Sequence, residues 1–311
     1  MQALAETAIA KWPISPLKIA LAAHRENAVF RVDADEGVFA LRLHRQNYRT
    51  DIELQSEMQF MAVLAEHGIA VPQPIKSRTS NSVEHVGQTQ ASVLTWLNGR
   101  PLGKTGMPLD IPDRLETFER FGQLIAKMHN VTDVWRNPST FTRQTWDVEG
   151  LLGEAPQWGR FWNNPRLTPP QQKILLAVRN KLRSELLSQN FDTGLIHADL
   201  VSENILVDGT DLHIIDFDDS GHGFRLQDLA TALVKHEAEP DFAALKQALL
   251  QGYCSFRPCD TSKIDLFLLI RHLTYVGWVV ERMADVEGEA RCAGYITNAV
   301  RKSEACLSNC L

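Results

Sequence analysis

Apolar and polar positions alternate in two short stretches near the start of the chain, and this alternation predicts a β-hairpin. Residues 28–32 (AVFRV) and 38–43 (VFALRL) are rich in β-branched and aromatic side chains, and the segment DADEG between them is typical of a tight turn. Residues 51–68 change to helical spacing and end at a glycine, which predicts one helix. Another apolar strand is expected within residues 90–102 (QASVLTWLNGRPL), where it leads into a turn that contains glycine.

The pattern becomes predominantly helical after about residue 98. Residues 114–130 (RLETFERFGQLIAKMHN) and 169–189 (PPQQKILLAVRNKLRSELLSQ) carry apolar positions at helical spacing, and the last third of the chain is also mostly helical. We therefore expect a boundary near Asn98. Residues 1–97 would form a small α+β lobe, and residues 98–311 a larger, mainly helical lobe.

One basic and one acidic side chain in the first lobe are predicted to pair in the interior. Strand alternation places Ala40 and Arg42 on the same face of the second hairpin strand. Glu57 precedes Phe60 and Leu64 by three and seven positions, so it shares the apolar stripe of the predicted helix. A carboxylate on a core-facing stripe needs a partner, because an unpaired charge is costly to bury. We expect Arg42 to provide it.

Composition and charge restrict the class of protein. The chain has 311 residues, 44% hydrophobic and 23% charged, which is ordinary for a globular protein with a substantial core. A net charge of −6 argues against a broad basic surface for nucleic acid. Glu6 and Lys11 stand where a secretory signal would be apolar, and the apolar stretch 264–280 is short and interrupted by Asp265 and Arg271. We therefore expect a cytoplasmic protein without a membrane partner, and a buried helix at 264–280.

The segment NGRPLGKTG, residues 98–106, nearly matches a phosphate-binding P-loop, but two features argue against that interpretation. The pattern requires glycine where Asn98 stands, and it requires a helix that begins at Lys104. Pro108 and Pro112 follow almost at once and are incompatible with such a helix. We expect a Gly-containing turn here.

Residues 194–219 (GLIHADLVSENILVDGTDLHIIDFDD) are mostly apolar, yet they carry several acidic side chains. GLIHADL, NILV and LHIID are typical of short strands, so the polar residues fall at strand ends and in the connecting loop. They form the pattern H-x-D-x-x-x-x-N followed by I-D, which contains Asp199, Asn204 and Asp216. Phosphoryl transfer from a magnesium nucleotide needs a carboxylate to accept the proton of the attacking hydroxyl, and oxygen ligands for Mg²⁺. The pattern therefore predicts a phosphoryl-transfer site.

The segments HADLVSEN, IIDFDD and DLATAL resemble the aminoglycoside phosphotransferase and choline kinase family of the protein-kinase-like fold. Within this family the chain resembles the bacterial homoserine-kinase-like and stress-response-kinase-like members, and the resemblance covers nearly the whole chain. It implies an α+β, bilobal fold with a small N-terminal β-sheet lobe, which has one helix, and a larger, mainly helical C-terminal lobe. It also implies ATP and Mg²⁺ as cofactors.

The resemblance assigns roles to the residues of the pattern. Asp199 would be the catalytic base, and Asn204 and Asp216 would hold Mg²⁺. His197 would be a structural member of the same loop. Asp228, in QDLATAL, would brace that loop from the start of a helix, although a carboxylate that only favours a helix N-terminus is the alternative.

Nucleotide contacts are also implied by the resemblance. Arg42 takes the place of the phosphate-binding lysine on the third strand, with Glu57 as its partner, and a plain structural ion pair is the alternative. Ala40 is small and lies on the same face, so adenine would fit against the strand. The other expected contacts are the backbone at two positions of LTWLNG and one side chain of HRENAVFRV, a phosphate-covering loop without glycine: Thr95, Leu97 and Asn27.

The acceptor is expected to be a small molecule. Asp216 and Asp228 are only 12 residues apart and no A-P-E motif lies between them, so a long segment that docks a protein substrate is not expected. In WVVERMADVEGEA, Trp278 and Glu281 would suit an amine through cation–π contact and charge pairing. A solvated, acidic helix end is the alternative.

Asp218 and Asp219 are left open between solvent, metal and substrate. Taken together, the patterns predict an ATP- and Mg²⁺-dependent phosphotransferase that acts on a hydroxyl group of a small, amine-bearing molecule, such as an amino alcohol or a homoserine-like or aminoglycoside-like compound. A stress-response-type protein Ser/Thr kinase and a non-catalytic nucleotide-binding regulator are the alternatives. The oligomeric state stays open.

Overall fold

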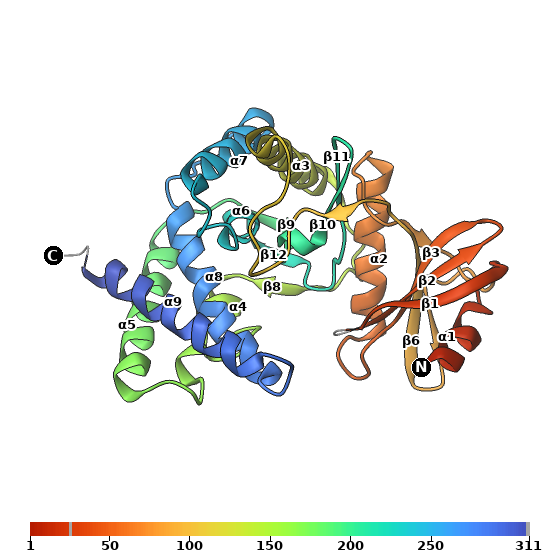
Figure 1. Ribbon diagram of the computed structural model, residues 1–311, viewed down its shortest axis with the longest axis horizontal. Helices are drawn as coiled ribbons and strands as arrows, with labels where there is room; N and C mark the ends of the chain where they lie inside the picture. The colour runs from red at the N-terminus through yellow and green to blue at the C-terminus, as the bar shows by residue number, and fades with distance from the viewer. Residues whose placement is uncertain (25–26, 309–311) are drawn as a thin grey trace. The chain divides into compact units, whose positions relative to one another are not determined.

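The computed structural model describes residues 1–24 and 27–308. The chain divides into two compact units, which are described separately (Figure 1). Unit 1 consists of Met1–Leu102, Asn130–Arg143 and Glu203–Asp218, and unit 2 consists of Gly103–His129, Gln144–Ser202 and Asp219–Leu311. The lobe boundary near Asn98 stays a prediction.

Unit 1 is built on an antiparallel sheet. In sheet order its strands are β1 (Pro16–His24), β2 (Ala28–Ala34), β3 (Gly37–Leu43), β6 (Thr89–Thr95) and β4 (Pro74–Ile75), and β5 (Val83–Val86) also pairs with β6. The predicted hairpin is β2–β3, with Ala34 opposite Gly37. The strand predicted within residues 90–102 is β6, and its register against β3 places Arg42 opposite Ser92.

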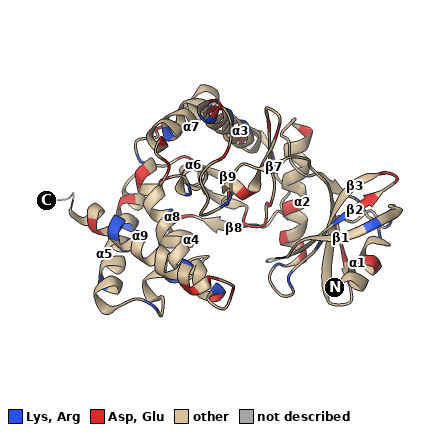
Figure 2. Ribbon diagram, in the orientation of Figure 1, with Lys and Arg blue, Asp and Glu red and all other residues tan. Residues whose placement is uncertain are grey.

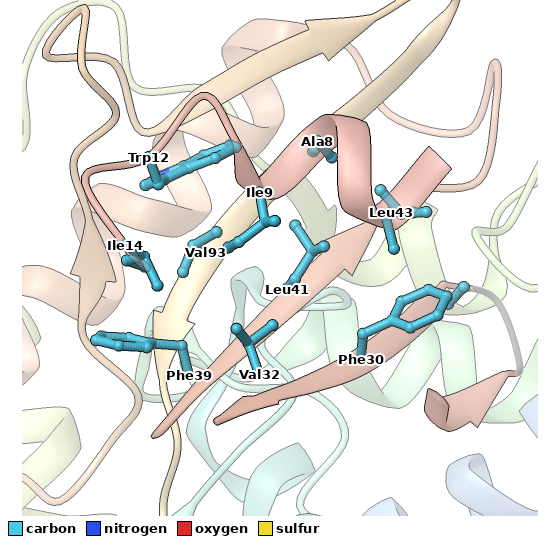
Figure 3. Packing of buried hydrophobic residues seen from close by; sticks show 13 residues of the cluster. Ala8, Ile9, Trp12, Ile14, Phe30, Val32, Phe39, Leu41, Leu43 and Val93 are labelled. Carbon is cyan, nitrogen blue, oxygen red and sulfur yellow. The ribbon is translucent and has the colours of Figure 1, made fainter. Parts of the chain in front are cut away.

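One face of this sheet carries the core of unit 1, and a helix covers that face. Phe30, Val32, Leu41 and Val93 point from the strands toward α1 (Gln2–Ile9), as Figure 3 shows. The fold class is confirmed, but the expectation of one helix beside the sheet was wrong, because α1 joins α2 there. Two of the three buried side chains of α1 are alanines, so its apolar stripe is weak in the sequence.

Helix α2 (Asp51–Glu66) realises the helix predicted for residues 51–68. A capping box defines its start, because the Thr50 hydroxyl accepts from the backbone N–H of Glu53 and the Glu53 carboxylate accepts from that of Thr50. Two residues after the last residue of α2, Gly68 has a φ of +77°, a left-handed conformation that favours glycine. Glu57 lies on the buried face of this helix, as predicted.

The Glu203–Asp218 segment of unit 1 contains a hairpin. β10 (Ile205–Asp208) and β11 (Asp211–Ile214) are antiparallel, and Asp208 lies opposite Asp211 across the predicted turn. β10 also pairs with β7 (Arg100–Pro101), so the segment after β6 completes a small second sheet. The hairpin lies between the two predicted metal ligands, Asn204 and Asp216, and fixes the backbone that connects them.

Unit 2 is mainly helical, and the loop with the H-x-D pattern follows a strand of its short sheet. Its sheet has the order β8 (Gln144–Trp146), β12 (Gly221–Phe224), β9 (Thr193–Ile196). Its helices are α4 (Val148–Leu152), α5 (Pro169–Ser188), α6 (Arg225–Val234), α7 (Phe242–Phe256), α8 (Ile264–Trp278) and α9 (Gly288–Ser308), with the short 3₁₀ helices η1 (Phe161–Asn163) and η3 (Val279–Arg282).

Helix α3 (Arg114–Val134) realises the helix predicted for residues 114–130, and its first sixteen residues belong to unit 2. The structure has no helix that begins at Lys104, in agreement with the argument against a P-loop. α8 is the predicted buried helix, and among the described residues no helix is both long and apolar enough to cross a membrane. Lysines, arginines and acidic residues are distributed over the elements of both units in Figure 2.

Candidate active site

The loop with the H-x-D pattern follows β9 in unit 2. His197 is fully buried, and Ala198 has a φ of 69°, a left-handed conformation that residues other than glycine rarely adopt. The carboxylate of Asp228 accepts hydrogen bonds from the backbone N–H groups of His197 (2.9 Å) and Ala198 (2.7 Å). Asp228 therefore holds the backbone of this turn, in addition to lying in the first turn of α6.

A third group donates to the same buried carboxylate. His129 Nε2 lies 3.1 Å from Asp228 Oδ2. Burial lowers the pKa of His129 to about 4, so the ring is neutral at pH 7 and the contact is a hydrogen bond rather than an ion pair. The neutral ring then accepts at Nδ1 from the hydroxyl of Tyr253. Burial raises the pKa of Asp228, but these hydrogen-bond donors outweigh it and the pKa is lowered.

Asp199 directly follows this strained turn. Its backbone N–H donates to His197 Nδ1 (3.2 Å), and its side chain is 26% exposed. Arg271 Nη2, from the buried helix α8, lies 2.5 Å from Asp199 Oδ1. In the sequence Arg271 stands out only as an interruption of an apolar stretch, and its contact with Asp199 was not predicted. The signal was available, because a charge inside a buried helix requires an opposite charge.

The two predicted metal ligands belong to unit 1. Asn204 ends the 3₁₀ turn η2 (Ser202–Asn204), and its carbonyl accepts from the N–H of Ile215 (2.9 Å). Asp216 follows Ile215, is exposed, and has a φ of 67°. The backbone bond keeps the two predicted ligands on neighbouring segments of unit 1.

The donor set suits a hard divalent cation that takes its other ligands elsewhere. Asn204 and Asp216 offer amide and carboxylate oxygens, which Mg²⁺ prefers, and Mg²⁺ typically combines one or two protein oxygens with water and substrate phosphates. Among the described residues, no group of three or more His, Cys, Asp or Glu side chains could hold a metal ion alone. The two residues therefore fit Mg²⁺ delivered with a nucleotide better than a metal bound only by protein.

The predicted pair of Arg42 and Glu57 is present in unit 1. Arg42 Nη1 donates to Glu57 Oε1 at 2.5 Å, and the Glu57 side chain is completely buried. Burial lowers the pKa of Arg42, but Glu57, Asp216 and Asp218 outweigh it, so the pKa is raised and the guanidinium stays charged. Burial and, to a smaller extent, the charge of Arg42 lower the pKa of His44 to about 3, so His44 is neutral.

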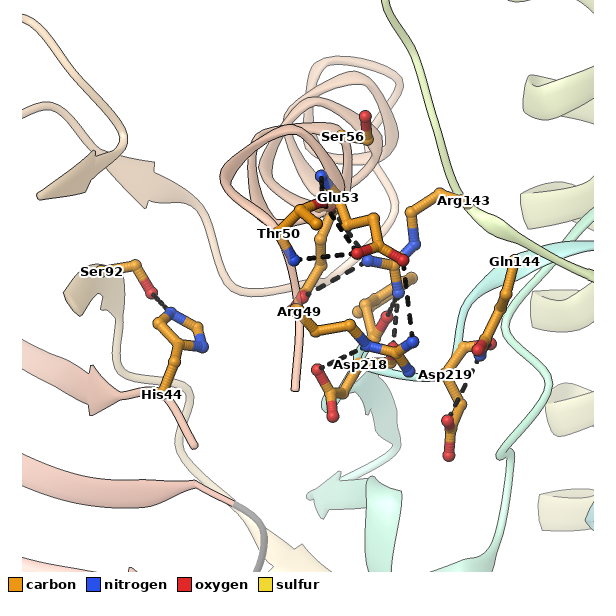
Figure 4. A network of polar contacts seen from close by, with 12 residues as sticks. His44, Arg49, Thr50, Glu53, Ser56, Ser92, Arg143, Gln144, Asp218 and Asp219 are labelled. Carbon is orange, nitrogen blue, oxygen red and sulfur yellow. Dashed lines mark hydrogen bonds and ion pairs between the residues drawn. The ribbon is translucent and has the colours of Figure 1, made fainter. Parts of the chain in front are cut away.

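Two further arginines, Arg49 and Arg143, extend this pair into a network, and Figure 4 shows these two arginines beside α2. Arg143 donates to the carbonyls of Phe217 (3.0 Å) and Asp218 (2.5 Å), and Arg49 donates to the same Asp218 carbonyl (2.9 Å). Arg143 also donates to the carbonyl of Glu53 in α2 (3.0 Å). Asp218 is therefore buried among arginines, so of the three alternatives left open for it, exposure to solvent does not apply.

The neighbouring Asp219 has partners in unit 2. Its carbonyl accepts from Trp146 Nε1 (2.7 Å) and from Gln144 Nε2 (2.8 Å). Its side chain is half-buried, and Gln144 Nε2 lies 3.3 Å from its Oδ1. The backbone of Asp219 is thus fixed by two side chains that precede it by more than 70 residues.

The predicted adenine-binding positions lie on β3 and after β6. Ala40 is half-buried, and Leu97 follows the end of β6. The N–H of Thr95 donates to the carbonyl of Gln73 (2.9 Å), so adenine could bind the Thr95 backbone only through its carbonyl. Asn27 Oδ1 accepts from the backbone N–H of Arg45, which gives this side chain a structural contact. Residues 25 and 26 of the predicted phosphate-covering loop lie outside the described residues.

The two substrate residues predicted near the end of α8, Trp278 and Glu281, differ from each other in their exposure. Trp278 is half-buried, and the guanidinium carbon of Arg282 lies 4.1 Å from the centre of its ring. Glu281 is exposed on the 3₁₀ helix η3. Since a cation of the chain itself already covers the Trp278 ring, the cation–π argument for a substrate amine at this residue is weakened.

Three features of this chain are typical of a protein-kinase-like phosphotransferase. They are the buried Arg–Glu pair between a strand and a helix, the braced H-x-D loop, and the acidic residue after a short hairpin. The comparison with protein families agrees. The profile of the Phosphotransferase enzyme family matches residues 19–264, and the chain belongs to that family.

Individual relatives carry the similarity over most of the chain. Amicoumacin kinase of Bacillus subtilis (strain 168) is 28% identical, over 92% of this chain and 86% of its own. A homoserine kinase of Bartonella tribocorum (strain CIP 105476 / IBS 506) is 25% identical, over 84% of this chain and 78% of its own. The structure of a microcompartment-associated aminopropanol kinase has a TM-score of 0.87 and 26% identity, covering 99% of this chain and 98% of the other.

Proposed function

We propose that this protein transfers the γ-phosphoryl group of ATP to a hydroxyl group of a small, amine-bearing molecule. The observation that carries the proposal is the braced loop of Asp199 in a chain whose family match spans residues 19–264. Aminopropanol and homoserine, which the names of two relatives contain, each combine a hydroxyl group with an amine. An amino alcohol is therefore the first acceptor to test.

In unit 2, Asp199 would orient the acceptor hydroxyl and accept its proton as the oxygen attacks phosphorus. Its partly exposed carboxylate is compatible with access by a small molecule. Asp228 would act indirectly, because it holds the strained backbone that places Asp199. His197 and His129 are buried and would remain structural.

In unit 1, Arg42 would bind phosphate oxygens of the nucleotide, and Glu57 would hold its guanidinium in place. Asn204 and Asp216 would hold Mg²⁺ through their side-chain oxygens. The metal, when bound, supplies neutralisation of the charge on the transferred group. Ala40, Leu97 and the carbonyl of Thr95 would contact adenine.

The short segment between Asp216 and Asp228 supports a small acceptor. Strand β12 and the first turn of α6 occupy most of it, so a long loop of the kind that docks protein substrates does not fit there. A protein Ser/Thr kinase is therefore less well supported. The cytoplasmic location stays a prediction.

A coupled assay for ADP release would test the proposal. The purified protein, with Mg-ATP, would be offered aminopropanol, homoserine, choline, kanamycin and casein in parallel. We expect turnover with at least one small amine-bearing alcohol, and loss of that turnover in Asp199→Asn with retained binding of Mg-ATP. Turnover with casein alone would favour the protein kinase. Binding of Mg-ATP without turnover on any acceptor would favour the regulator.

A further inference from the structure

Arg271 is a charged side chain inside a helix that is mostly buried and apolar. Its side chain is only 1% exposed. The guanidinium carbon lies 4.2 Å from the centre of the Trp158 ring and 4.7 Å from that of Tyr275. Two aromatic rings therefore cover this cation and stabilise its charge through cation–π contact.

The carboxylate that pairs with this cation is Asp199. Arg271 Nη2 lies 2.5 Å from Asp199 Oδ1, although 72 residues separate the two in sequence. Burial by itself lowers the pKa of Arg271, but Tyr275 and Asp199 outweigh it and the pKa is raised. The guanidinium thus stays charged, and one carboxylate oxygen of Asp199 is held in a charge-assisted hydrogen bond.

Such a bond restricts Asp199 more than the backbone brace does. Asp228 fixes the main chain of the loop, but it leaves the side-chain torsions of Asp199 undetermined. A rigid cation at Oδ1 selects one side-chain conformation of Asp199. A near-attack geometry depends on this kind of fixation, because a displacement of about 1 Å can cost about 100-fold in rate.

We propose that Arg271 is a positioning residue, which holds the carboxylate of Asp199 in the orientation that receives the acceptor hydroxyl. The inference rests on the proposed function, in which Asp199 is the base. Lysine could supply the charge but not the planar group that packs against Trp158 and Tyr275. The proposed role of Arg271 therefore depends on the planar geometry of its side chain as well as on its charge.

Arg271→Met and Arg271→Lys would be compared with Arg179→Met as a matched control. Arg179 is also buried in unit 2, lies 4.1 Å from the centre of the Trp162 ring and pairs with Glu154, but it contacts neither Asp199 nor its loop in the described contacts. Two reactions would be followed: phosphorylation of aminopropanol and the slow hydrolysis of Mg-ATP, in which water replaces the acceptor. Thermal unfolding would report stability for each variant.

We expect Arg271→Met to lower kcat about 100-fold, while KM for ATP stays within about twofold. Arg271→Lys should recover only part of that loss, and added guanidinium should restore Arg271→Met several-fold but not Asp199→Asn. In an Asp199→Asn background, Arg271→Met should cause little further loss, because the two residues act as one unit. Arg179→Met should lower stability and leave kcat within about threefold of the wild type.

A folded Arg271→Met protein with kcat within about threefold of the wild type would overturn the inference and leave the proposed function intact. Equal losses in Arg271→Met and Arg179→Met, or loss of folding in both Arg271 variants, would assign Arg271 to stability instead. Full activity in Asp199→Asn, or a wild-type protein without turnover in either reaction, would refute the proposed function itself, and with it this inference.

Discussion

Asp228→Asn tests how strongly one buried carboxylate stabilises the loop of Asp199. The carboxylate accepts three hydrogen bonds, from the N–H groups of His197 and Ala198 and from His129 Nε2. Asparagine has one acceptor oxygen and places an NH₂ group against at least one of these donors. Hydrogen bonds to a charged group contribute about 1.5–3 kcal/mol each, and an unsatisfied buried donor costs about 1–3 kcal/mol. One lost bond and two weakened ones give an expected loss of about 3–5 kcal/mol.

The assay is urea unfolding followed by tryptophan fluorescence, with Asp265→Asn as the control. Asp265 also lies in the first turn of a helix, but its side chain is 75% exposed and pairs with Lys246. Asp265→Asn should cost about 0.3–1 kcal/mol, the usual contribution of an acidic residue at a helix N-terminus. Hydrogen exchange should show loss of protection at the amides of His197 and Ala198 in Asp228→Asn only. Equal, small losses in both variants would refute the brace and leave only the helix-terminus explanation.

Three further outcomes can be measured with the same protein. Glu57→Gln removes the partner of the buried Arg42 and should lower stability by about 3–5 kcal/mol and kcat/KM for ATP more than tenfold, as a urea titration and the coupled assay would show. Gly122→Ala places a Cβ 2.0 Å from the carbonyl oxygen of Leu249, where α3 meets α7. Thermal unfolding should show a loss of stability of several kcal/mol, and an unchanged stability would mean that α7 shifts freely. The pKa of Asp228 is lowered in the folded protein. The stabilisation that Asp228 provides should therefore be complete above its pKa in the unfolded chain, about 3.9, and should be lost as the pH falls through its pKa in the folded protein. The difference in unfolding free energy between the wild type and Asp228→Asn should accordingly be constant above about pH 5 and shrink at lower pH.

Local patterns were sufficient for most elements of the fold. Helix α2 follows from its apolar spacing and its termini, and the β2–β3 hairpin follows from two β-rich runs on either side of a turn. These signals lie within a few residues of one another, so a single sequence contains them. Helix α1 was missed because two of its three buried residues are alanines, whose burial becomes evident only when the sheet packs against them.

Part of the candidate site could also be predicted from the sequence. The Arg42–Glu57 pair could be predicted, because strand alternation and helix spacing each placed one charge on a buried face, and each charge then required the other. The role of Asp218 could not be read in the same way. Arg49 and Arg143 precede it by more than 70 residues, and nothing local marks them as its partners.

The sequence alone determined which groups perform the proposed chemistry, since the spacing of Asp199, Asn204 and Asp216 at the ends of short strands is a local property. Only the tertiary structure decided what holds those groups in place. Arg271 and Asp228 reach the loop of Asp199 from helices 72 and about 30 residues away. A buried charge shows in the sequence that a partner must exist, but the choice of partner depends on how distant helices pack, and no periodicity of the chain records that.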